Sequence, residues 1–330
     1  MTRFYVGPMS KNVVDCVIEF NEKCKSDIFA LIPSRRQVEY CGGYVGWTTK
    51  EFANYVNGRA IIERDHGGPG QGIYGLSDGT VSFSHDAKVF DMIHIDPWRK
   101  YPEFWDGLEK TVELILSTYK QNKYILFEVG TEESIRPFST LELGLLLQEL
   151  WKRLPFYIFR NIRYAVVQSG VGLDLGNMIN TRTFNEDKLL RMTSICEDYG
   201  ILSKEHNGDY LTTTEIEARF DNGLDAINIA PEFGQIETIC YLDAISEIQS
   251  NKERQTIIDK FYDICYESKK WEKWVGDDFI PEENKEFLIK ICGHYVLASE
   301  EFKIISKMFP INSVIREKIN LRLKELYLLL

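Results

Sequence analysis

The feature that most constrains the fold of this chain is a repeated alternation of short apolar runs with amphipathic helical segments. Such alternation is typical of parallel strands joined by helical crossovers, and eight such units close into a barrel. We therefore predict an α/β fold, a (β/α)8 TIM barrel with extra N- and C-terminal helices. A doubly wound open sheet is the runner-up, but it would more often carry a GxGxxG turn after its first strand, where this sequence has none. The expected strands are residues 28–32, 61–66, 92–95, 124–127, 162–167, 201–204, 226–230 and 295–298.

The length of 330 residues, with 44% hydrophobic composition, is compatible with one large barrel. We expect a single domain over residues 1–330. Residues 1–26 would form an N-terminal helical extension, and residues 252–330 a C-terminal helical elaboration that includes the last strand. Residues 73–90 are expected to form a long glycine-containing loop whose role the sequence does not indicate.

Charge and cysteine usage narrow the partners and the compartment. The net charge of −11 argues against nucleic acid and against anionic membrane surfaces, which both select basic proteins. No run approaches the roughly 20 apolar residues of a membrane span. The start lacks the apolar core of a signal peptide, and seven scattered cysteines without a CxxC pair indicate reduced thiols. We therefore expect a cytoplasmic protein.

The stretch from Ile61 to Gly72, IIERDHGGPGQG, places an acid beside an imidazole at the end of an expected buried strand. Side chains alternate along a strand, so Glu63 and Asp65 should point the same way. The glycines that follow allow the backbone to bend, which would turn His66 toward the space that Asp65 faces. This pair is a candidate base and metal ligand; a salt-bridged strand end with a glycine-rich turn is the alternative.

Polar residues collect at the carboxyl ends of the other expected strands as well. Active sites of this barrel fold lie at those ends, so we predict that these side chains meet over one mouth of the barrel. The residues concerned are Asp65, His66, His94, Asp96, Glu128, Glu132, Gln168, Lys204, Glu205, His206 and Asn228.

Imidazoles with one or two carboxylates suit a divalent ion, most simply Zn²⁺, in an open three-ligand site. The preferred ligands are His66 and His206 with Glu128 as the third, and His94 is the substitute. A metal at a carbonyl or hydroxyl oxygen would stabilise an enediolate. Asp65 would then be the general base, with its pKa raised by partial burial, and Glu128 a second catalytic carboxylate.

Two further chemistries are open. Lys204 on the sixth expected strand would form a Schiff base with a ketose, although a salt bridge to Glu205 or Asp209 is the favoured explanation. Arginines near strand ends, Arg35 and Arg36 followed by Gln37, would clamp a phosphate or carboxylate, with Arg99 and Arg136 in the same cationic group. The predicted substrate-contacting set is Arg35, Arg36, Gln37, His94, Asp96, Glu132, Gln168, Lys204, Asn207, Asp209 and Asn228.

The segments QVEYCGGYVGWTTKEF, RDHGGPGQG, MIHID, EVGTEE, VVQSGVG, EHNGDYLT and INIAPEFG occur in that order between Leu31 and Leu242. This order resembles the accessory ("non-catalytic") subunits of class II tagatose-bisphosphate aldolase, with a weaker echo at His294 and in VIREKINLRLKEL. The resemblance implies a barrel related to zinc-dependent class II ketose-bisphosphate aldolases and to ketose 4-epimerases. It also implies Asp65 as the base and His66 and His206 as metal ligands. The chain departs from the family pattern at residues 32–36 and 232–234, which are places expected to contact substrate.

The leading hypothesis is a metal-dependent carbohydrate enzyme, an aldol or retro-aldol lyase or a 4-epimerase, acting on a phosphorylated or acidic keto-sugar. The alternative is a non-catalytic subunit that stabilises a separate class II aldolase through apolar surface on its last helix, at Ile315, Ile319, Leu323 and Leu326. The further alternative is a Schiff-base lyase. The expected partners are a small sugar or sugar phosphate and either a second copy of the chain or an aldolase subunit.

Overall fold

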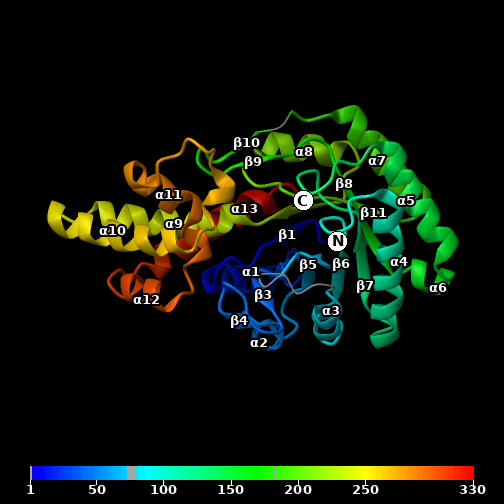
Figure 1. Cartoon of the computed structure of the whole chain (residues 1–330), viewed down its shortest axis with the longest axis horizontal. Coiled ribbons are helices and arrows are strands. Elements are labelled where there is room, and N and C mark those ends of the chain that lie inside the picture. Colours follow the sequence, from blue (N-terminus) through cyan, green and yellow to red (C-terminus); the bar gives the residue numbers. More distant parts are fainter. Residues whose placement is uncertain (1, 73–78, 182) are drawn as a thin grey trace.

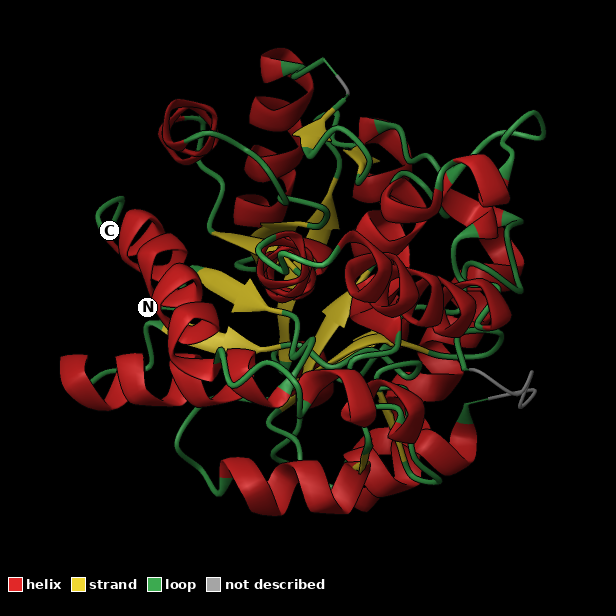
Figure 2. Cartoon of the chain, turned by 90° about the vertical axis from the view of Figure 1, so that its left-hand side faces the viewer, coloured by secondary structure: helices red, strands yellow, loops and turns green. Residues whose placement is uncertain are grey.

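The computed structural model describes residues 2–72, 79–181 and 183–330, and it is a (β/α)8 barrel (Figure 1). Helices surround the ring of strands when the molecule is viewed from its side (Figure 2). The barrel strands are β1 Phe4–Val6, β2 Phe29–Leu31, β5 Glu63–Gly67, β6 Met92–Ile95, β7 Leu126–Val129, β8 Ile162–Val167, β11 Leu202–Glu205 and β12 Ala226–Ile229. The helices that follow them in turn are α1 Lys11–Cys24, α2 Thr49–Val56, α3 Thr80–Asp86, α4 Phe104–Gln121, α5 Thr140–Arg153, α7 Glu186–Asp198, α8 Thr213–Asp221 and α9 Pro231–Ser246.

All eight barrel strands are parallel, in the order β2-β1-β12-β11-β8-β7-β6-β5. The ring closes between β2 and β5 through two parallel bridges, Leu31 with Ile62 and Ser34 with Asp65. This closure places the carboxyl ends of all eight strands around one mouth.

The prediction of a strand at residues 295–298 is wrong. Residues Gly293–Tyr295 form a 3₁₀ helix instead, and the eighth strand is β1 at the start of the chain. β1 lies between β2 and β12, and both Phe4 and Val6 are fully buried. The expectation of a helical extension over residues 1–26 is therefore also wrong, because α1 is the first helix of the barrel.

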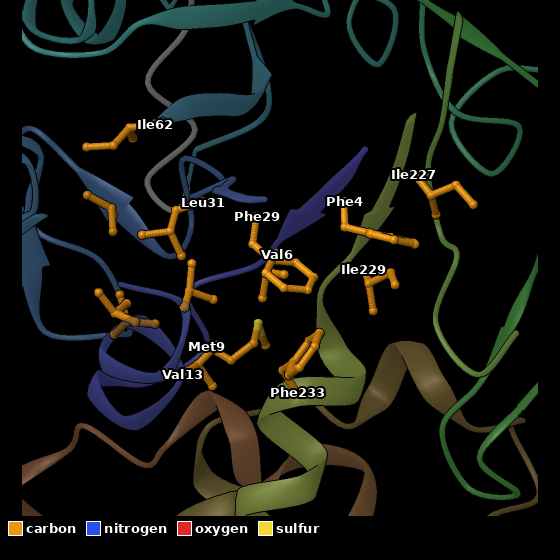
Figure 3. Packing of buried hydrophobic residues seen from close by; sticks show 14 of the residues in the cluster. Phe4, Val6, Met9, Val13, Phe29, Leu31, Ile62, Ile227, Ile229 and Phe233 are labelled. Carbon is orange, nitrogen blue, oxygen red and sulfur yellow. The ribbon is translucent and has the colours of Figure 1, made fainter. Parts of the chain in front are cut away.

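The outward-facing side chains of the strands form the main core, beneath the surrounding helices. Figure 3 shows Phe4 and Val6 of β1 with Phe29 of β2 and Ile229 of β12 gathered beside Phe233 of α9. Alternate residues along each strand bury an apolar face here, which is the pattern that fixes strand register.

The inward-facing side chains fill the barrel in layers. Tyr5, Ala30, Met92, Tyr164 and Ala226 form an apolar cluster in which the Tyr5 and Tyr164 hydroxyls are 3.2 Å apart. One step nearer the carboxyl ends, the inward positions on β5, β7 and β11 are Glu63, Glu128 and Lys204. The next inward positions belong to the site described below.

The helices begin where the sequence offers capping groups. Thr48, Ser139 and Thr212 each form a reciprocal capping box with a glutamate three residues later. α9 begins at Pro231, because proline is well accommodated in the first turn of a helix. The loop expected over 73–90 contains α3 in its second half, and residues 73–78 lie outside the described residues.

Beyond the barrel, the chain continues through α10 Asn251–Glu267, α11 Lys285–Cys292, α12 Glu300–Ser306 and α13 Asn312–Tyr327. α10, α11 and α12 project from one side of the barrel (yellow to orange-red in Figure 1). α13 packs on α1 and α9, the first and last barrel helices. Ile315, Ile319, Leu323 and Leu326 are fully buried in this contact, so they offer no exposed surface to a partner subunit.

The short elements outside the barrel are two small sheets, a four-residue helix and three 3₁₀ turns. They are β3 Val38–Glu39 with β4 Trp47–Thr48, β9 Leu173–Asp174 with β10 Ile179–Asn180, α6 Phe156–Phe159, Glu272–Trp274, Pro281–Glu283 and Gly293–Tyr295. All seven cysteines are free thiols. None of the helices in the described ranges is long and apolar enough to span a membrane.

Candidate metal centre

Three imidazoles and one carboxylate meet at the mouth of the barrel. His66 ends β5, His94 lies on β6 and His206 follows β11, and their ring centroids are 5.0 to 5.3 Å apart. With Asp65 they form a group whose potential ligand atoms all lie within 4.8 Å of one another. His66 reaches the group because it adopts a left-handed backbone, φ 43°, at an irregularity in the pairing of β5 with β6. The bend is therefore at His66 itself, one residue before the expected glycines.

Each imidazole is anchored by one nitrogen to an oxygen outside the group. His66 Nδ1 is 2.7 Å from Asp96 Oδ2, and His206 Nε2 is 2.7 Å from Glu128 Oε1. His94 Nε2 is 3.0 Å from the carbonyl oxygen of Gly130. Because these oxygens accept hydrogen bonds, each neutral ring carries its proton on the anchored nitrogen. The other nitrogen of each ring then carries the lone pair that could bind an ion, and in His94 this nitrogen also accepts a long hydrogen bond, 3.4 Å, from the backbone N–H of His66.

The free nitrogens face Asp65. His206 Nδ1 is 3.6 Å and His94 Nδ1 is 3.9 Å from Asp65 Oδ1, and His66 Nε2 is 3.8 Å from Asp65 Oδ2. Asp65 Oδ1 is buried and accepts no hydrogen bond in the described structure. A buried carboxylate oxygen surrounded by imidazole lone pairs is unfavourable unless a cation lies among them. The residues present therefore fit a divalent ion.

The charges around the centre favour positive charge within it. Burial acts to lower the pKa of His66, but Asp65 and Glu132 outweigh burial and raise it. Glu132 Oε2 is 3.6 Å from His66 Nε2. Burial acts to raise the pKa of Asp65, yet His66, His94 and His206 together lower it. The prediction of a raised pKa for Asp65 is thus wrong, because three imidazoles surround a single carboxylate.

Lys204 lies directly beneath the centre, with its side chain fully buried. Its ammonium donates to Glu63 Oε2 at 2.5 Å and to Glu128 Oε2 at 2.6 Å, and it lies 3.7 Å from the centre of the Tyr5 ring. Glu205 and Asp209, the partners expected for Lys204, instead bind Arg219 and the start of α9. Burial would lower the pKa of Lys204, but Glu128 and Glu63 raise it, so the amine is held in its charged form. A charged amine is not a nucleophile, which disfavours the Schiff-base chemistry.

Several residues expected to contact substrate have their polar groups occupied by the framework. Arg35 is buried, and it binds Glu39 at 2.6 Å and the carbonyl of Gly68 at 2.5 Å. Gln37 accepts from Ser34 N at 2.7 Å. Gln168 accepts from the backbone of Phe138 and donates to the carbonyls of Thr131 and Arg136, which fixes the loop after β7. Asp209 accepts from the backbone nitrogens of Ala230 and Glu232.

Other predicted residues do face the centre or keep polar groups available. Asn207 donates to Glu132 Oε2 at 2.6 Å. Asn228 is buried, and both polar atoms of its carboxamide lack hydrogen-bond partners in the described structure. Arg99 donates to Gln71 Oε1, which leaves part of its guanidinium available, whereas Arg136 is engaged by Glu142 and by the Pro102 carbonyl.

The predicted site residues omitted three that matter in the structure. Glu63 shares Lys204 with Glu128, Gln71 binds Asp96 at 3.0 Å, and Lys273 approaches the mouth from the C-terminal segment. The alternation of β5 already places Glu63 inward with Asp65, so its position was readable from the sequence. Lys273 follows no strand, and no sequence signal points to it.

The fold resembles solved structures at low sequence identity. A probable tagatose 6 phosphate kinase from Sinorhizobium meliloti 1021 is 13% identical over 100% of both chains, with a TM-score of 0.76. The native fructuronate-tagaturonate epimerase UxaE from Cohnella laeviribosi is 10% identical over 98% of this chain and 81% of its own, with a TM-score of 0.58. The YdjI aldolase from Escherichia coli K12 is 10% identical over 92% and 91%, with a TM-score of 0.52. No family model and no curated protein matches the chain. The fold is thus one that carbohydrate aldolases and an epimerase also use.

Proposed function

We propose that this protein is a metal-dependent carbohydrate enzyme, an aldol or retro-aldol lyase or a 4-epimerase of a phosphorylated or acidic keto-sugar. The single observation that carries the proposal is the unpaired, buried Oδ1 of Asp65 among three imidazole nitrogens whose opposite nitrogens are anchored. The aldolase and epimerase among proteins of similar fold support the same reaction class.

His66, His94 and His206 would hold the ion, and a set of imidazoles suits Zn²⁺. Glu128 is better assigned as a positioning residue than as the third ligand, because its two oxygens bind His206 and Lys204. The substitute ligand His94 takes its place. When bound, the ion would act as a Lewis acid on a carbonyl or hydroxyl oxygen of the sugar.

Asp65 would act as the general base. Its lowered pKa keeps the carboxylate ionised at neutral pH. It would accept the proton of a sugar hydroxyl as the adjacent carbon–carbon bond breaks, and return that proton in the reverse direction. Asn228, whose carboxamide is buried and unpaired, would bind a second hydroxyl of the substrate.

The test combines metal content with turnover of a panel of ketose phosphates and keto-uronates, with and without chelator. Protein purified without chelator should hold about one divalent ion per chain. Asp65→Asn should keep the ion and lose turnover by about a hundredfold to ten-thousandfold, the usual contribution of a general base. Asp106→Asn, at an exposed position on α4, is the matched control and should behave as wild type.

The outcomes separate the roles of Asp65. Full activity in Asp65→Asn would show that Asp65 is not the base. Loss of the ion in that variant would show that Asp65 is a metal ligand. Turnover that resists chelator, with borohydride trapping of substrate on the chain, would instead support the lysine chemistry. The partner-subunit alternative loses the apolar surface on which it was based, since the inward face of α13 is buried.

A further inference from the structure

A small cavity of about 140 Å³ lies between the loop after β2 and the segment that follows α10. Four cationic side chains line it, those of Arg36, Lys269, Lys270 and Lys273, against the single carboxylate of Glu272. The rings of Tyr44 and Tyr295, whose centroids are 5.1 Å apart, complete its wall. We call this cavity the cationic cleft. It has an excess of positive charge in a chain whose net charge is −11.

The two principal cations of the cleft form no ion pair of their own. In the described parts of the chain, no salt bridge includes Arg36 or Lys273. Lys273 makes cation–π contacts: its ammonium lies 4.3 Å from the centre of the Trp274 ring and 5.2 Å from that of Tyr295. Desolvation by the neighbouring groups, together with the charges of Arg36 and Arg99, lowers the pKa of Lys273 to about 8, although the residue as a whole remains exposed. Cations that outnumber the nearby carboxylates attract an anion.

The cleft lies on the same side of the barrel as the proposed metal centre. Arg36 lies five residues beyond β2, on the same side of the barrel as the ends of β5 and β6. Glu132 links the two places: its Oε2 is 3.6 Å from His66 Nε2, and its charge acts on both Arg36 and Lys273. One carboxylate thus acts on an imidazole of the centre and on two cations of the cleft.

We propose that the cationic cleft binds the phosphate group of the substrate, with Arg36 and Lys273 as the principal contacts. This inference rests on the proposed function and specifies the substrate as a phosphate ester. The cleft is sized for one small anionic group rather than a sugar ring, so a terminal substituent would occupy it. Several converging cations favour a phosphate dianion over a carboxylate, which carries one charge and two oxygens. The segment that follows α10 would thus contribute to the specificity of the site.

The test is calorimetric titration of the full-length protein with inorganic phosphate at low ionic strength, where screening is weak. We expect saturable binding that is about tenfold weaker or more in Lys273→Gln and in Arg36→Gln, the loss of one charge-assisted hydrogen bond. Lys252→Gln on α10, an exposed lysine away from the cleft, is the matched control and should bind as wild type. Thermal melts of all three variants verify that each is folded.

Two further measurements identify the preferred anion and the place where it binds. Glucuronate, a sugar carboxylate, should bind more weakly than phosphate; equal or tighter binding would overturn the preference for a phosphate ester. Phosphate binding should survive chelator treatment and the Asp65→Asn change, because the cleft lies apart from the imidazoles. Binding that vanishes with chelator and is unchanged in Lys273→Gln and Arg36→Gln would overturn the proposal.

Failure of this inference is distinguishable from failure of the proposed function. Phosphate binding in the cleft without turnover of any sugar would support the phosphate site and contradict the proposed enzyme activity. Chelator-sensitive turnover with the same KM for a ketose phosphate in wild type and Lys273→Gln would support the proposed enzyme activity and contradict the phosphate site. If both hold, Lys273→Gln should raise KM for the phosphorylated sugar with kcat little changed.

Discussion

At the scale of single residues, the candidate centre depends on side chains that never touch an ion. Asp96 is buried on β6's carboxyl side and receives hydrogen bonds from both His66 Nδ1 and Gln71. Its carboxylate fixes the ring orientation and the tautomer of His66, so that Nε2 presents its lone pair to the centre.

We predict that Asp96→Asn weakens the affinity for Zn²⁺ by about 10- to 100-fold, the usual effect of removing such an anchoring carboxylate. Metal-competition titration with a chromophoric chelator measures this affinity directly. Asp198→Asn, exposed at the end of α7, is the matched control. An unchanged affinity in Asp96→Asn would mean that His66 does not need this anchor, or is not a ligand.

The residues of the centre were largely readable from the sequence, because the side chains concerned follow the alternation of strands. Asp65, His94 and His206 come at the ends of well-marked apolar runs, so the fold alone brings them together. The partners of Glu128 and Arg35 could not be predicted from the sequence, since both depend on which side chains enter the barrel from non-adjacent strands. Lys204 meets Glu63 from the far side of the ring, a contact 141 residues apart in sequence.

At the scale of elements, α13 packs against both the first and the last helix of the barrel. Its inward residues are fully buried against α1 and α9, while Leu321 on the other face is 55% exposed. The helix therefore contributes to stability through one face only.

We predict that Leu323→Ala lowers the free energy of unfolding by about 2–5 kcal/mol, the cost of truncating a buried leucine. Leu321→Ala, a change of the same chemistry on the same helix, should alter it by less than about 0.5 kcal/mol. Denaturant unfolding of the two variants makes the comparison. Equal effects would show that α13 does not pack as described.

Elements with strong local signals were predictable, and elements stabilised mainly by tertiary contacts were not. β6 matches its expected bounds, and α5 and α7 start where Ser139 and Asn185 cap them. β1 has only three residues, too few to show a period, and becomes a strand because two neighbours bury it. The apolar run at 295–298 has strand-like composition, but no edge of the closed ring is left for it to pair with.

At the scale of the whole molecule, the candidate centre joins opposite parts of the ring. His66 and His94 come from neighbouring strands, whereas His206 follows β11, which is separated from β6 by β7 and β8. An ion held by all three would connect two arcs of the barrel.

We predict that Zn²⁺ stabilises the fold against heat, because an ion that binds only the native state adds about 2.7 kcal/mol at a hundredfold excess over its Kd. Differential scanning calorimetry should show a higher Tm with Zn²⁺ than with chelator. The shift should be lost in His206→Ala and kept in His85→Ala, which removes an exposed histidine outside the group. A shift that persists in His206→Ala would place the ion elsewhere.

The place of β1 in the ring has a consequence for how the chain is made. Phe4 pairs with Ile227, so β1 lacks one of its two neighbours after it leaves the ribosome until more than two hundred further residues have followed. At about 5–20 residues per second, that interval lasts roughly 10 to 50 s. During it, the nascent barrel is an open sheet with an unpaired edge, the form of the molecule most exposed to aggregation.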